Sequence, residues 1–365
     1  MTFFMNRRGF IKAASSAIAV GAVASRASAQ SSDELRVAVG GGATGKAKIE
    51  AYVKPFEAET GVKVTAITDD FPPLQLELMT AANNVTVDVV GLNVSDLIVA
   101  ARKGQLEKID YSIYKKDELD GLLDFAKDDF GVGYIVYSYV MAYNTEKFPA
   151  NRPRPATWAE FWDVNKFPGA RTLVAGAYGS EGPWEEALLA DGVAPEALYP
   201  MDIDRIFASL GKIKPHIRKW WGSGSEIYQM MKDKNADLMQ SYDGRAQSLV
   251  DQGAPIEINR NQAKLTWDLF AIPKGSPNAH NAQRFIEFLT RADRQAAYTK
   301  LLPYGPTNRN AFKFIPEEIG RKLASNPEFL GTSIVMNARW YTEVGSDGLS
   351  NTERLVQRWN EWILL

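Results

Sequence analysis

The chain has no cysteine, and this absence excludes disulfides, thiolate metal sites, cysteine nucleophiles and a lipid-modified N-terminal cysteine. It has only two histidines, His216 and His280, so a serine–histidine–acid triad or a multi-histidine metal centre has little support. We interpret both as surface residues, because one follows Pro215 in a basic segment and the other starts a helical pattern. No Gly-x-Ser-x-Gly nucleophile elbow is present. We therefore expect a protein that is not an enzyme and that holds no cofactor or metal ion.

Long hydrophobic runs are lacking beyond the N-terminus, where no segment has the ~20 apolar residues of a transmembrane helix. A basic surplus is lacking as well, since 42 Lys and Arg face 44 Asp and Glu. Four of the basic residues lie before residue 30, and without them 38 cations remain against 44 acids, a net charge of −6. Because nucleic acids bind basic surfaces, we expect no nucleic-acid partner.

The N-terminal residues 1–29 have the parts of a bacterial export signal. Arg7 and Arg8 precede an Ala/Val/Ile-rich run that ends at Val23, and Ala27-Ser28-Ala29 follows as a small-x-small cleavage site. The apolar run has roughly half the ~20 residues of a membrane span, so we interpret the segment as a twin-arginine signal cleaved after Ala29. A general secretory signal with a chance arginine pair remains open. Either signal predicts a soluble protein of the periplasm.

Alternating strand and helix patterns predict an α/β fold. Leu35–Val39 has a strand pattern, and after a glycine-rich turn a helical pattern runs to Gly61, which supplies the stop. Val62–Ile67 and Val87–Val90 continue as strands, and Ser95 or Asp96 is the expected cap of the next helix. Repeated strand–helix units of this length indicate parallel strands flanked by helices.

The mature length of about 335 residues exceeds what one core normally supports, so we expect two lobes. The extended aromatic run Gly133–Asn144 is followed by Arg152-Pro153-Arg154-Pro155, which indicates a strand that crosses between lobes. Leu265–Ile272 is the candidate for the return crossing. The predicted division is residues 31–138 plus 266–311 for lobe 1, 139–265 for lobe 2, and 312–365 as C-terminal helices packing on the lobes.

A glycine-rich segment, Gly40–Lys46, fits the G-x-x-x-x-G-K part of a nucleotide-binding loop. Ala47 stands where that loop needs a Ser or Thr, and ATP is absent outside the cytosol, so we do not expect nucleotide hydrolysis. A glycine turn into a helix N-terminus still offers N–H groups to a carboxylate, phosphate or phosphonate. A plain tight turn remains the alternative. The candidate residues here are Gly41, Gly42 and Thr44.

Acids stand beside aromatic residues near the predicted crossings, as Tyr242-Asp243, Trp267-Asp268 and Tyr304 before Gly305-Pro306. A carboxylate beside a ring suits an ammonium ligand, because it gives a charge-assisted hydrogen bond while the ring adds a cation–π attraction of ~0.5–2 kcal/mol. Each pair alone is also compatible with a structural role.

Several segments, in their order and spacing, carry a family resemblance. They are Met141–Pro149, Thr157–Asp163, Asp237–Met239, Tyr242–Ala246, Gly253–Ile256, Ala271–Asn278 and Tyr304–Asn308, with a weaker match at Phe56–Val64. In them the chain resembles the extracellular solute-binding proteins of ABC importers, in the spermidine/putrescine-binding branch. The resemblance implies a two-lobed, type II-like periplasmic binding protein fold, with two mixed sheets joined by crossing hinge strands. It also implies a monomer that closes its cleft on a small solute and delivers the solute to an ABC permease in the inner membrane.

The resemblance also implies a set of ligand-binding residues. Tyr242, Asp268 and Tyr304 match the family's aromatic and acidic box around an amine. The first-lobe crossing segment and the loop after the third strand add Tyr137, Ser138 and Asn93. Less closely matched or neighbouring candidates complete the set: Glu181, Trp184, Trp221, Ser223, Asp243 and Trp267.

The chain departs from the family pattern at its first loop, where Gly41–Thr44 replaces aromatics that sandwich a polyamine. A zwitterionic or anionic solute, such as an amino-acid conjugate or a phosphonate, therefore remains open beside a polyamine. Arg245 is either a clamp for a solute carboxylate or a structural partner of an acid. Ferric iron held by clustered tyrosines is a further alternative. An exported hydrolase built on Glu185 and Glu186 is disfavoured, because neighbouring helix positions point in different directions.

Overall fold

The computed structural model describes residues 34–69 and 71–365, and the predicted export signal lies outside these residues. The chain from Ser31 onward forms one compact unit. None of the helices in the described ranges has both the length and the apolar character needed to cross a bilayer.

The first strand and helix unit follows the predicted pattern. In the described chain, β1 (Glu34–Ala38) and β2 (Lys63–Ile67) form a parallel two-stranded sheet. Between them a continuous helical segment runs through α1 (Gly42–Lys48), the π-helical η1 (Ile49–Val53) and α2 (Lys54–Thr60). Gly61 ends this segment in the left-handed region at φ +74°, as predicted. Its apolar face lies in a core that includes Tyr52, stacked on Tyr298 at 5.2 Å.

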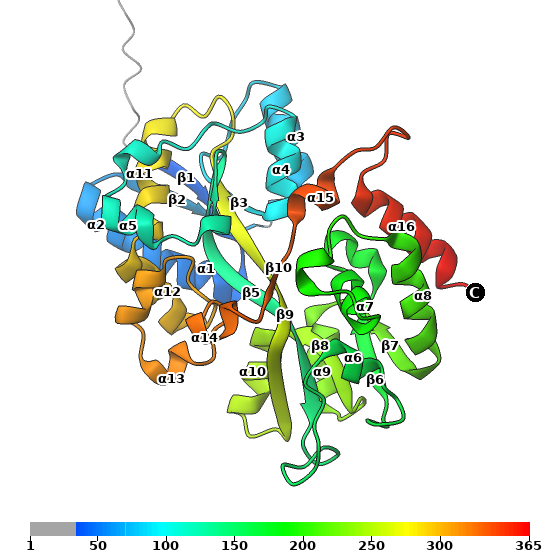
Figure 1. The fold of residues 1–365 in the computed structure, drawn as a ribbon. Coiled ribbons are helices and arrows are strands. Elements are labelled where there is room, and N and C mark those ends of the chain that lie inside the picture. The colour runs from blue at the N-terminus through cyan, green and yellow to red at the C-terminus, as the bar shows by residue number, and fades with distance from the viewer. Residues whose placement is uncertain (1–33, 70) are drawn as a thin grey trace, which may run out of the picture. The chain divides into compact units, whose positions relative to one another are not determined.

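The larger sheet is organised around two long strands, β5 (Gly131–Asn144) and β9 (Ile256–Ala271), which are antiparallel along nearly their whole length. Strand β3 (Val90–Asn93) pairs with the C-terminal end of β9, while β8 (Leu238–Tyr242) pairs with the C-terminal end of β5. Parallel strands β6 (Arg171–Val174) and β7 (Ile217–Trp221) extend the sheet beyond β8. Figure 1 shows β5 and β9 running from one group of elements to the other. The predicted crossing strands and the mixed α/β class are confirmed, and the return crossing is longer than Leu265–Ile272.

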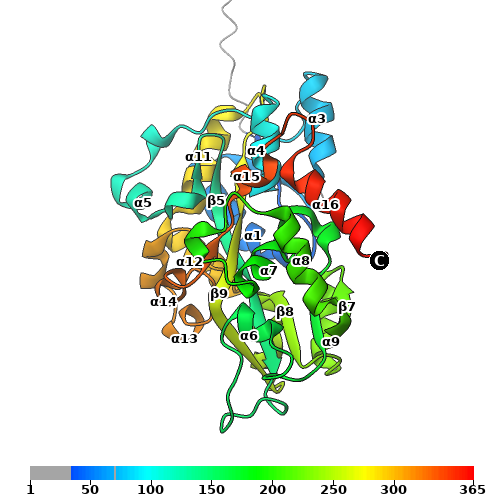
Figure 2. The same cartoon turned by 45° about the vertical axis from the view of Figure 1, so that its right-hand side comes forward.

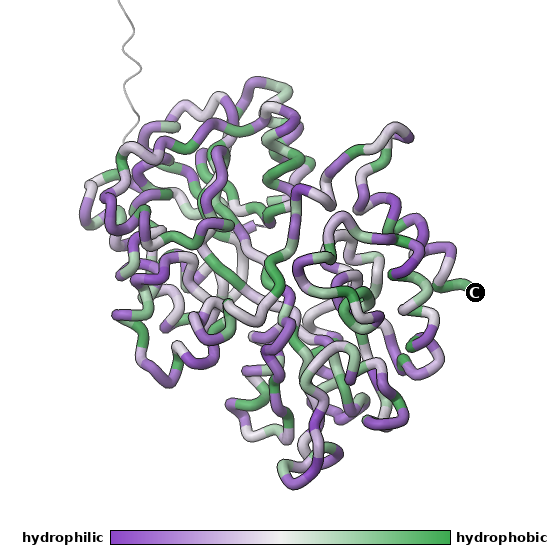
Figure 3. The backbone as a smooth tube through the Cα atoms, viewed as in Figure 1, coloured by the Kyte–Doolittle hydropathy of each residue, from purple (hydrophilic) through white to green (hydrophobic). Residues whose placement is uncertain are grey.

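The helices divide between the two ends of this strand pair. The first group consists of α3 (Pro73–Ala81), α4 (Val94–Arg102), α5 (Lys116–Gly121), α11 (Ala279–Thr290) and α12 (Ala292–Leu301). The second group consists of α6 (Trp158–Trp162), α7 (Trp184–Ala190), α8 (Ile203–Ile213), α9 (Gly224–Lys232) and α10 (Asp243–Asp251). Figure 3 shows apolar stretches along the central strands and polar residues at the peripheral turns, in agreement with the buried pattern of β5. This division matches the expected organisation in outline, and the lobe boundaries stay a prediction.

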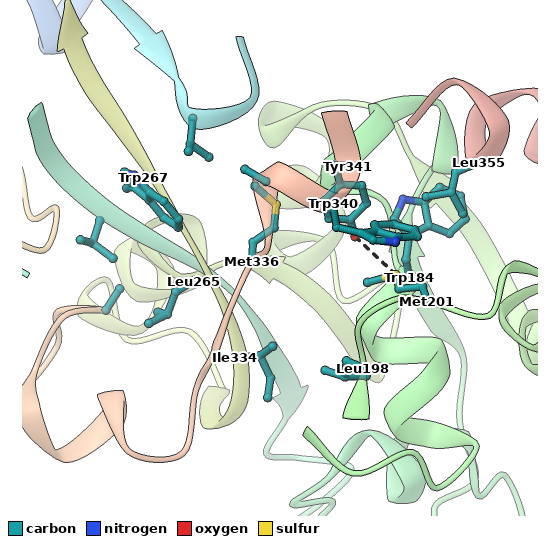
Figure 4. Close-up of a cluster of buried hydrophobic side chains, with 14 of the residues drawn as sticks. Trp184, Leu198, Met201, Leu265, Trp267, Ile334, Met336, Trp340, Tyr341 and Leu355 are labelled. Carbon is teal, nitrogen blue, oxygen red and sulfur yellow. Dashed lines mark hydrogen bonds between the residues drawn. The ribbon is translucent and has the colours of Figure 1, made fainter. Parts of the chain in front are cut away.

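The last part of the chain contacts both groups. It comprises α13 (Glu317–Gly320), α14 (Pro327–Leu330), β10 (Ile334–Val335), α15 (Ala338–Thr342) and α16 (Asn351–Trp362). Helix α15 packs on α4, as the turned view in Figure 2 also shows, and α16 packs on the short helix η4 (Gly176–Glu181). Trp359 of α16 lies edge-on to Trp184 at 6.2 Å inside a buried cluster. Figure 4 shows Trp184 of this cluster near Tyr341 and Leu355. The C-terminal helices α15 and α16 therefore contribute to the core, and a loop separates them.

Two local expectations differ from the structure near β3. The strand begins at Val90 and not at Val87, because the buried Asp88 accepts hydrogen bonds from Arg36, Ser276 and Asn278 side chains and lies outside the strand. The cap of α4 is Asn93 and not Ser95 or Asp96. Its side-chain oxygen accepts from the Asp96 N–H at 2.9 Å.

A buried charged cluster joins β9 to the second group. The Lys264 ammonium donates to the Gly182 carbonyl at 2.6 Å and to Glu185 and Glu186 at 3.0 and 3.2 Å. Tyr341 of α15 donates to Glu185 at 2.7 Å, and Gln240 of β8 donates to Glu186 at 2.7 Å. Burial raises the pKa of Glu186 to about 7. Glu185 and Glu186 are thus sealed in the core with a cation and do not form an accessible acid–base pair.

We predict that Lys264→Met destabilises the protein by ~3–5 kcal/mol, because it leaves two buried carboxylates without their cation. The free energy of unfolding in urea measures the loss. Lys103→Met is the matched control, since Lys103 pairs with Glu77 on the surface and both side chains are about half exposed. Its expected cost is below ~1 kcal/mol. Equal costs for the two substitutions would contradict the assignment.

Candidate functional site

A cavity of about 570 Å³ opens beside the crossing strands. The turn after β1, the helix α1, the end of β3 and both crossing strands contribute to its walls. Glu181, at the end of η4, is its one lining residue from the second group of elements in the described chain. The polar and aromatic lining residues are Thr44, Lys48, Asp69, Phe71, Asn93, Asp96, Tyr134, Tyr137, Glu181 and Asp268, with Gly40, Gly41 and Gly91 at the backbone.

The glycine turn shapes one wall of this cavity. Gly40 and Gly42 have φ values of +74° and +61°, which side chains rarely adopt. A Cβ on Gly45 would meet the Gly40 carbonyl oxygen at 1.9 Å, so the turn and the helix are in close approach. The turn therefore starts α1 directly at the cavity edge. Lys48, at the end of that short helix, is thereby brought to the cavity wall.

Two carboxylates and three tyrosines form the polar centre of the site. The Tyr137 hydroxyl lies 3.1 Å from Glu181 Oε1 and 3.5 Å from Asp268 Oδ1, so it bridges the two acids. Tyr139 donates to the other Glu181 oxygen and is hydrogen-bonded to the Tyr242 hydroxyl at 2.8 Å. Tyr137 and Tyr139 share one face of β5 because side chains of a strand alternate. The strand alternation thus places both phenols against Glu181.

The electrostatics of the centre favour a positively charged guest. Burial and the neighbouring Glu181 charge raise the pKa of Asp268 to about 7, against the opposing effect of Lys48. Burial also raises the pKa of Asp96. Burial, followed by the Asp268 and Glu181 charges, raises the pKa of Tyr137 well above its usual value. These directions indicate negative charge that the surrounding protein does not fully compensate, so an ammonium group placed here would be stabilised.

Lys48 is the one cation among the described residues that line the cavity. Its ammonium lies 4.8 Å from the centre of the Tyr134 ring and 5.2 Å from that of Phe270. Burial lowers its pKa to about 8, and the charge of Asp268 opposes this shift. Sequence reasoning missed Lys48 and considered Lys46 instead. A usable signal existed, because Lys48 falls on the same helical face as the apolar Ala51 and Tyr52.

Six of the predicted site residues line this cavity together: Gly41, Thr44, Asn93, Tyr137, Glu181 and Asp268. Gly42 is exposed in the adjoining turn. Tyr242 and Tyr304 lie next to the lining, since their rings are 6.1 and 6.4 Å from the Tyr137 ring. These residues form one neighbourhood, and their contacts with a solute stay a prediction.

The other predicted residues lie away from the cavity wall. Trp184 and Trp221 are completely buried, with indole N–H groups donating to the carbonyls of Gly179 at 2.8 Å and Gln240 at 2.9 Å. Trp267 is buried against Phe125 at 4.8 Å between ring centres. Their burial and their contacts give these three tryptophans a packing role. Their positions in the sequence, next to an acid or a glycine, did not reveal this role.

Three polar candidates also have structural partners. Buried Asp243 pairs with Arg260 at 3.5 Å and accepts the Ser138 backbone N–H at 3.1 Å. The Ser138 side chain is buried as well, and only its backbone N–H is paired, because its hydroxyl has no hydrogen-bond partner in the described chain. Ser223 caps α9 by accepting the Glu226 N–H at 3.1 Å.

Asp96 and Tyr134 line the cavity but were not predicted as ligand residues. Asp96 was expected only as a helix cap, and its carboxylate accepts from Asn93 Nδ2 at 2.8 Å. Tyr134 stood in the crossing strand without a local signal. No cluster of three or more His, Asp or Glu side chains suited to a metal ion occurs among the residues that the structure describes.

Comparison with known proteins relates the chain to a transport family. The family model described as "Bacterial extracellular solute-binding protein" matches residues 51–329. A gamma-aminobutyric acid-binding protein of Pseudomonas aeruginosa is 31% identical over 93% of this chain and 94% of its own length. The spermidine/putrescine-binding periplasmic protein of Escherichia coli is 23% identical over 81% of this chain and 85% of its own length.

Solved structures agree in fold. An ABC transporter substrate-binding protein from Bradyrhizobium japonicum has a TM-score of 0.79 and 29% identity, covering 90% of this chain and 99% of that one. A GABA receptor structure has a TM-score of 0.79 and 30% identity, covering 90% of this chain and 97% of that one.

We predict that one aspartate titrates with a pKa near 7 in the solute-free protein, because Asp268 is buried beside a second carboxylate. Carbon-13 NMR of protein labelled only at aspartate carboxyls measures it across pH 4–9. The signal should be missing from Asp268→Asn and retained in Asp69→Asn, whose aspartate lies exposed at the cavity rim. A titration in which all aspartates finish below pH 5 would contradict the prediction.

Proposed function

The chain belongs to the bacterial extracellular solute-binding proteins, and from this membership we propose that its solute is a short ω-amino acid of the 4-aminobutyrate type. The resemblance expected from the sequence is confirmed: the protein is a substrate-binding protein of an ABC transporter with the two-lobed fold of that class. The solute itself is inferred from the charges of the site.

The amine end of the proposed solute binds at the bridged pair Asp268 and Glu181. A primary ammonium has three N–H donors, and two partly buried carboxylates with free lone pairs are its natural partners. The Tyr137 hydroxyl holds the two acids at 3.5 and 3.1 Å, so the pair is positioned before the solute arrives. The rings of Tyr137 and Tyr304 add cation–π surface. This bridged acid pair is the observation that carries the proposal.

The carboxylate end of the solute binds at Arg245 of α10. This arginine is exposed, and among the described residues no hydrogen bond or ion pair engages its guanidinium. Its side chain lies over Gly224, where an added Cβ would be 3.2 Å from Nε. The positive charge of Arg245 acts on the Tyr304 hydroxyl. Burial and the Asp268 charge raise the pKa of Tyr304, and the Arg245 charge opposes this rise. An arginine without a partner suits bidentate binding of a carboxylate.

This charge pattern favours an amino acid over a polyamine. A diamine would place its second ammonium towards Arg245, where like charges repel. The similarity values point the same way, since the relative named for gamma-aminobutyric acid is 31% identical and the one named for spermidine and putrescine is 23% identical. A polyamine remains the second candidate because acids outnumber cations on the cavity wall.

Solute capture proceeds by hinge closure about β5 and β9. Asp268 pairs in register with Asn93 of the first group, while Glu181 belongs to the second, so an ammonium that binds both acids favours the closed form. We retain residues 31–138 plus 266–311 and 139–265 as the two lobes. The closed monomer then docks on an inner-membrane permease, which receives the solute unchanged.

We predict that the mature protein binds 4-aminobutyrate more tightly than putrescine or spermidine in isothermal titration calorimetry. Asp268→Asn should weaken 4-aminobutyrate binding by ~100-fold, because a buried charge-assisted contact is lost. Asp117→Asn, at an exposed position that does not line the cavity, is the control and should change the dissociation constant by less than about threefold. Tighter binding of either polyamine, or an Asp268→Asn variant with unaltered affinity, would overturn the proposal.

The export route yields a separate prediction. We propose that residues 1–29 direct the protein to the periplasm through the twin-arginine pathway, with Gln30 as the first mature residue. Replacing Arg7 and Arg8 by lysine should leave the protein in the cytosol, as cell fractionation and N-terminal sequencing would show. Arg26→Lys, outside the arginine pair, should be exported normally. Export of the double lysine variant would instead indicate the general secretory route.

A further inference from the structure

Lys48 is a buried cation that the proposed function does not use. Its side chain is 7% exposed and lines the cavity from the end of α1. Within the described chain its ammonium makes no hydrogen bond and no ion pair, and it rests on the faces of Tyr134 and Phe270. Burying a lysine without a direct partner is costly. Neighbouring Ala51 and Tyr52 of the same buried face show that an apolar side chain would suit the position better.

The rings hold the ammonium where it acts on Asp268. Tyr134 and Phe270 lie 4.3 Å apart between ring centres, and Phe270 stands two residues along β9 from Asp268 on the same face. Lys48 and Asp268 act on each other electrostatically without direct contact. Because Lys48 does not contact Asp268, the lysine neutralises part of the Asp268 charge without occupying the carboxylate oxygen atoms, which stay accessible to a solute.

The count of charges at the centre depends on this lysine. Asp268 and Glu181 together carry two negative charges when ionised, which is what two ammonium groups would require. With Lys48 present the sum of these three charges is a single negative charge, which one ammonium group satisfies, while Asp96 lies on the same wall with its carboxylate hydrogen-bonded to Asn93. A second ammonium in the same cavity would meet the lysine in a medium of low dielectric constant, where repulsion between like charges is strong.

We propose that Lys48 is a specificity-determining residue, a fixed cation that restricts the site to solutes with one ammonium group. The inference rests on the proposed function, because it presumes that the amine binds at Asp268 and Glu181. Two residues would then determine specificity by charge. Arg245 attracts the solute carboxylate, and Lys48 repels a second ammonium group.

The test compares 4-aminobutyrate with putrescine on the mature protein and on Lys48→Met by isothermal titration calorimetry at pH 7. Removing the fixed cation should shift the ratio of the two dissociation constants at least tenfold in favour of putrescine. The affinity for 4-aminobutyrate should change by less than about threefold. Lys46→Met is the matched control, since it removes the same charge from an exposed position of the same helix outside the cavity wall.

Three results would decide against the inference. A ratio that stays within threefold of the parent value shows that Lys48 does not select by charge. Loss of 4-aminobutyrate binding by more than tenfold, with putrescine unaffected, shows that Lys48 contacts the solute carboxylate directly. A parent protein that binds neither compound overturns the proposed function and this inference with it. Lys48→Gln, which removes the charge and keeps a polar end, gives the same measurements if Lys48→Met does not fold.

Discussion

The hydrogen bonds that Tyr137 makes to Glu181 and Asp268 are the contact on which the site depends. They hold two partly buried carboxylates close together, and desolvation together with the Glu181 charge raises the pKa of Asp268. A protein that only had to be stable would avoid such a pair. A binding protein gains from it, because a cationic solute relieves the repulsion and the relief appears as affinity.

The three residues of this contact come from both crossing strands and from a segment next to α7, so the contact connects these parts of the chain. Tyr137 stands on β5 and Asp268 on β9, while Glu181 comes from the segment before α7. The buried Lys264 of β9 holds the carbonyl of Gly182, next to Glu181, and so fixes the position of that acid relative to the crossing strand. The proposed solute contact at Glu181 is therefore linked to the crossing strand β9 through the adjacent residue Gly182.

The sequence predicted the general architecture and six of the residues that line the cavity, and the physical reasons for success and failure differ. Alternation and apolar runs located β1, β2 and β5, since burial in the core determines these patterns. Family resemblance led to Tyr137, Asp268 and Glu181, which do line the cavity. Trp184 and Trp221 were chosen for their neighbours in sequence, but an indole needs a large buried space, and the core supplied it. Lys48 was missed although its place on an apolar helix face predicted its burial, because that pattern does not reveal which residues lie opposite.

The central claim is that the site binds an ammonium group between two acids and a carboxylate at an arginine. A crystal structure of the mature protein with 4-aminobutyrate tests it most directly. The account predicts density for the solute with its nitrogen in this cavity, within hydrogen-bonding distance of Asp268 and Glu181, and with its carboxylate on Arg245, which lies outside the cavity lining. A solute bound in another part of the molecule, or with its carboxylate facing the two acids, would contradict the account.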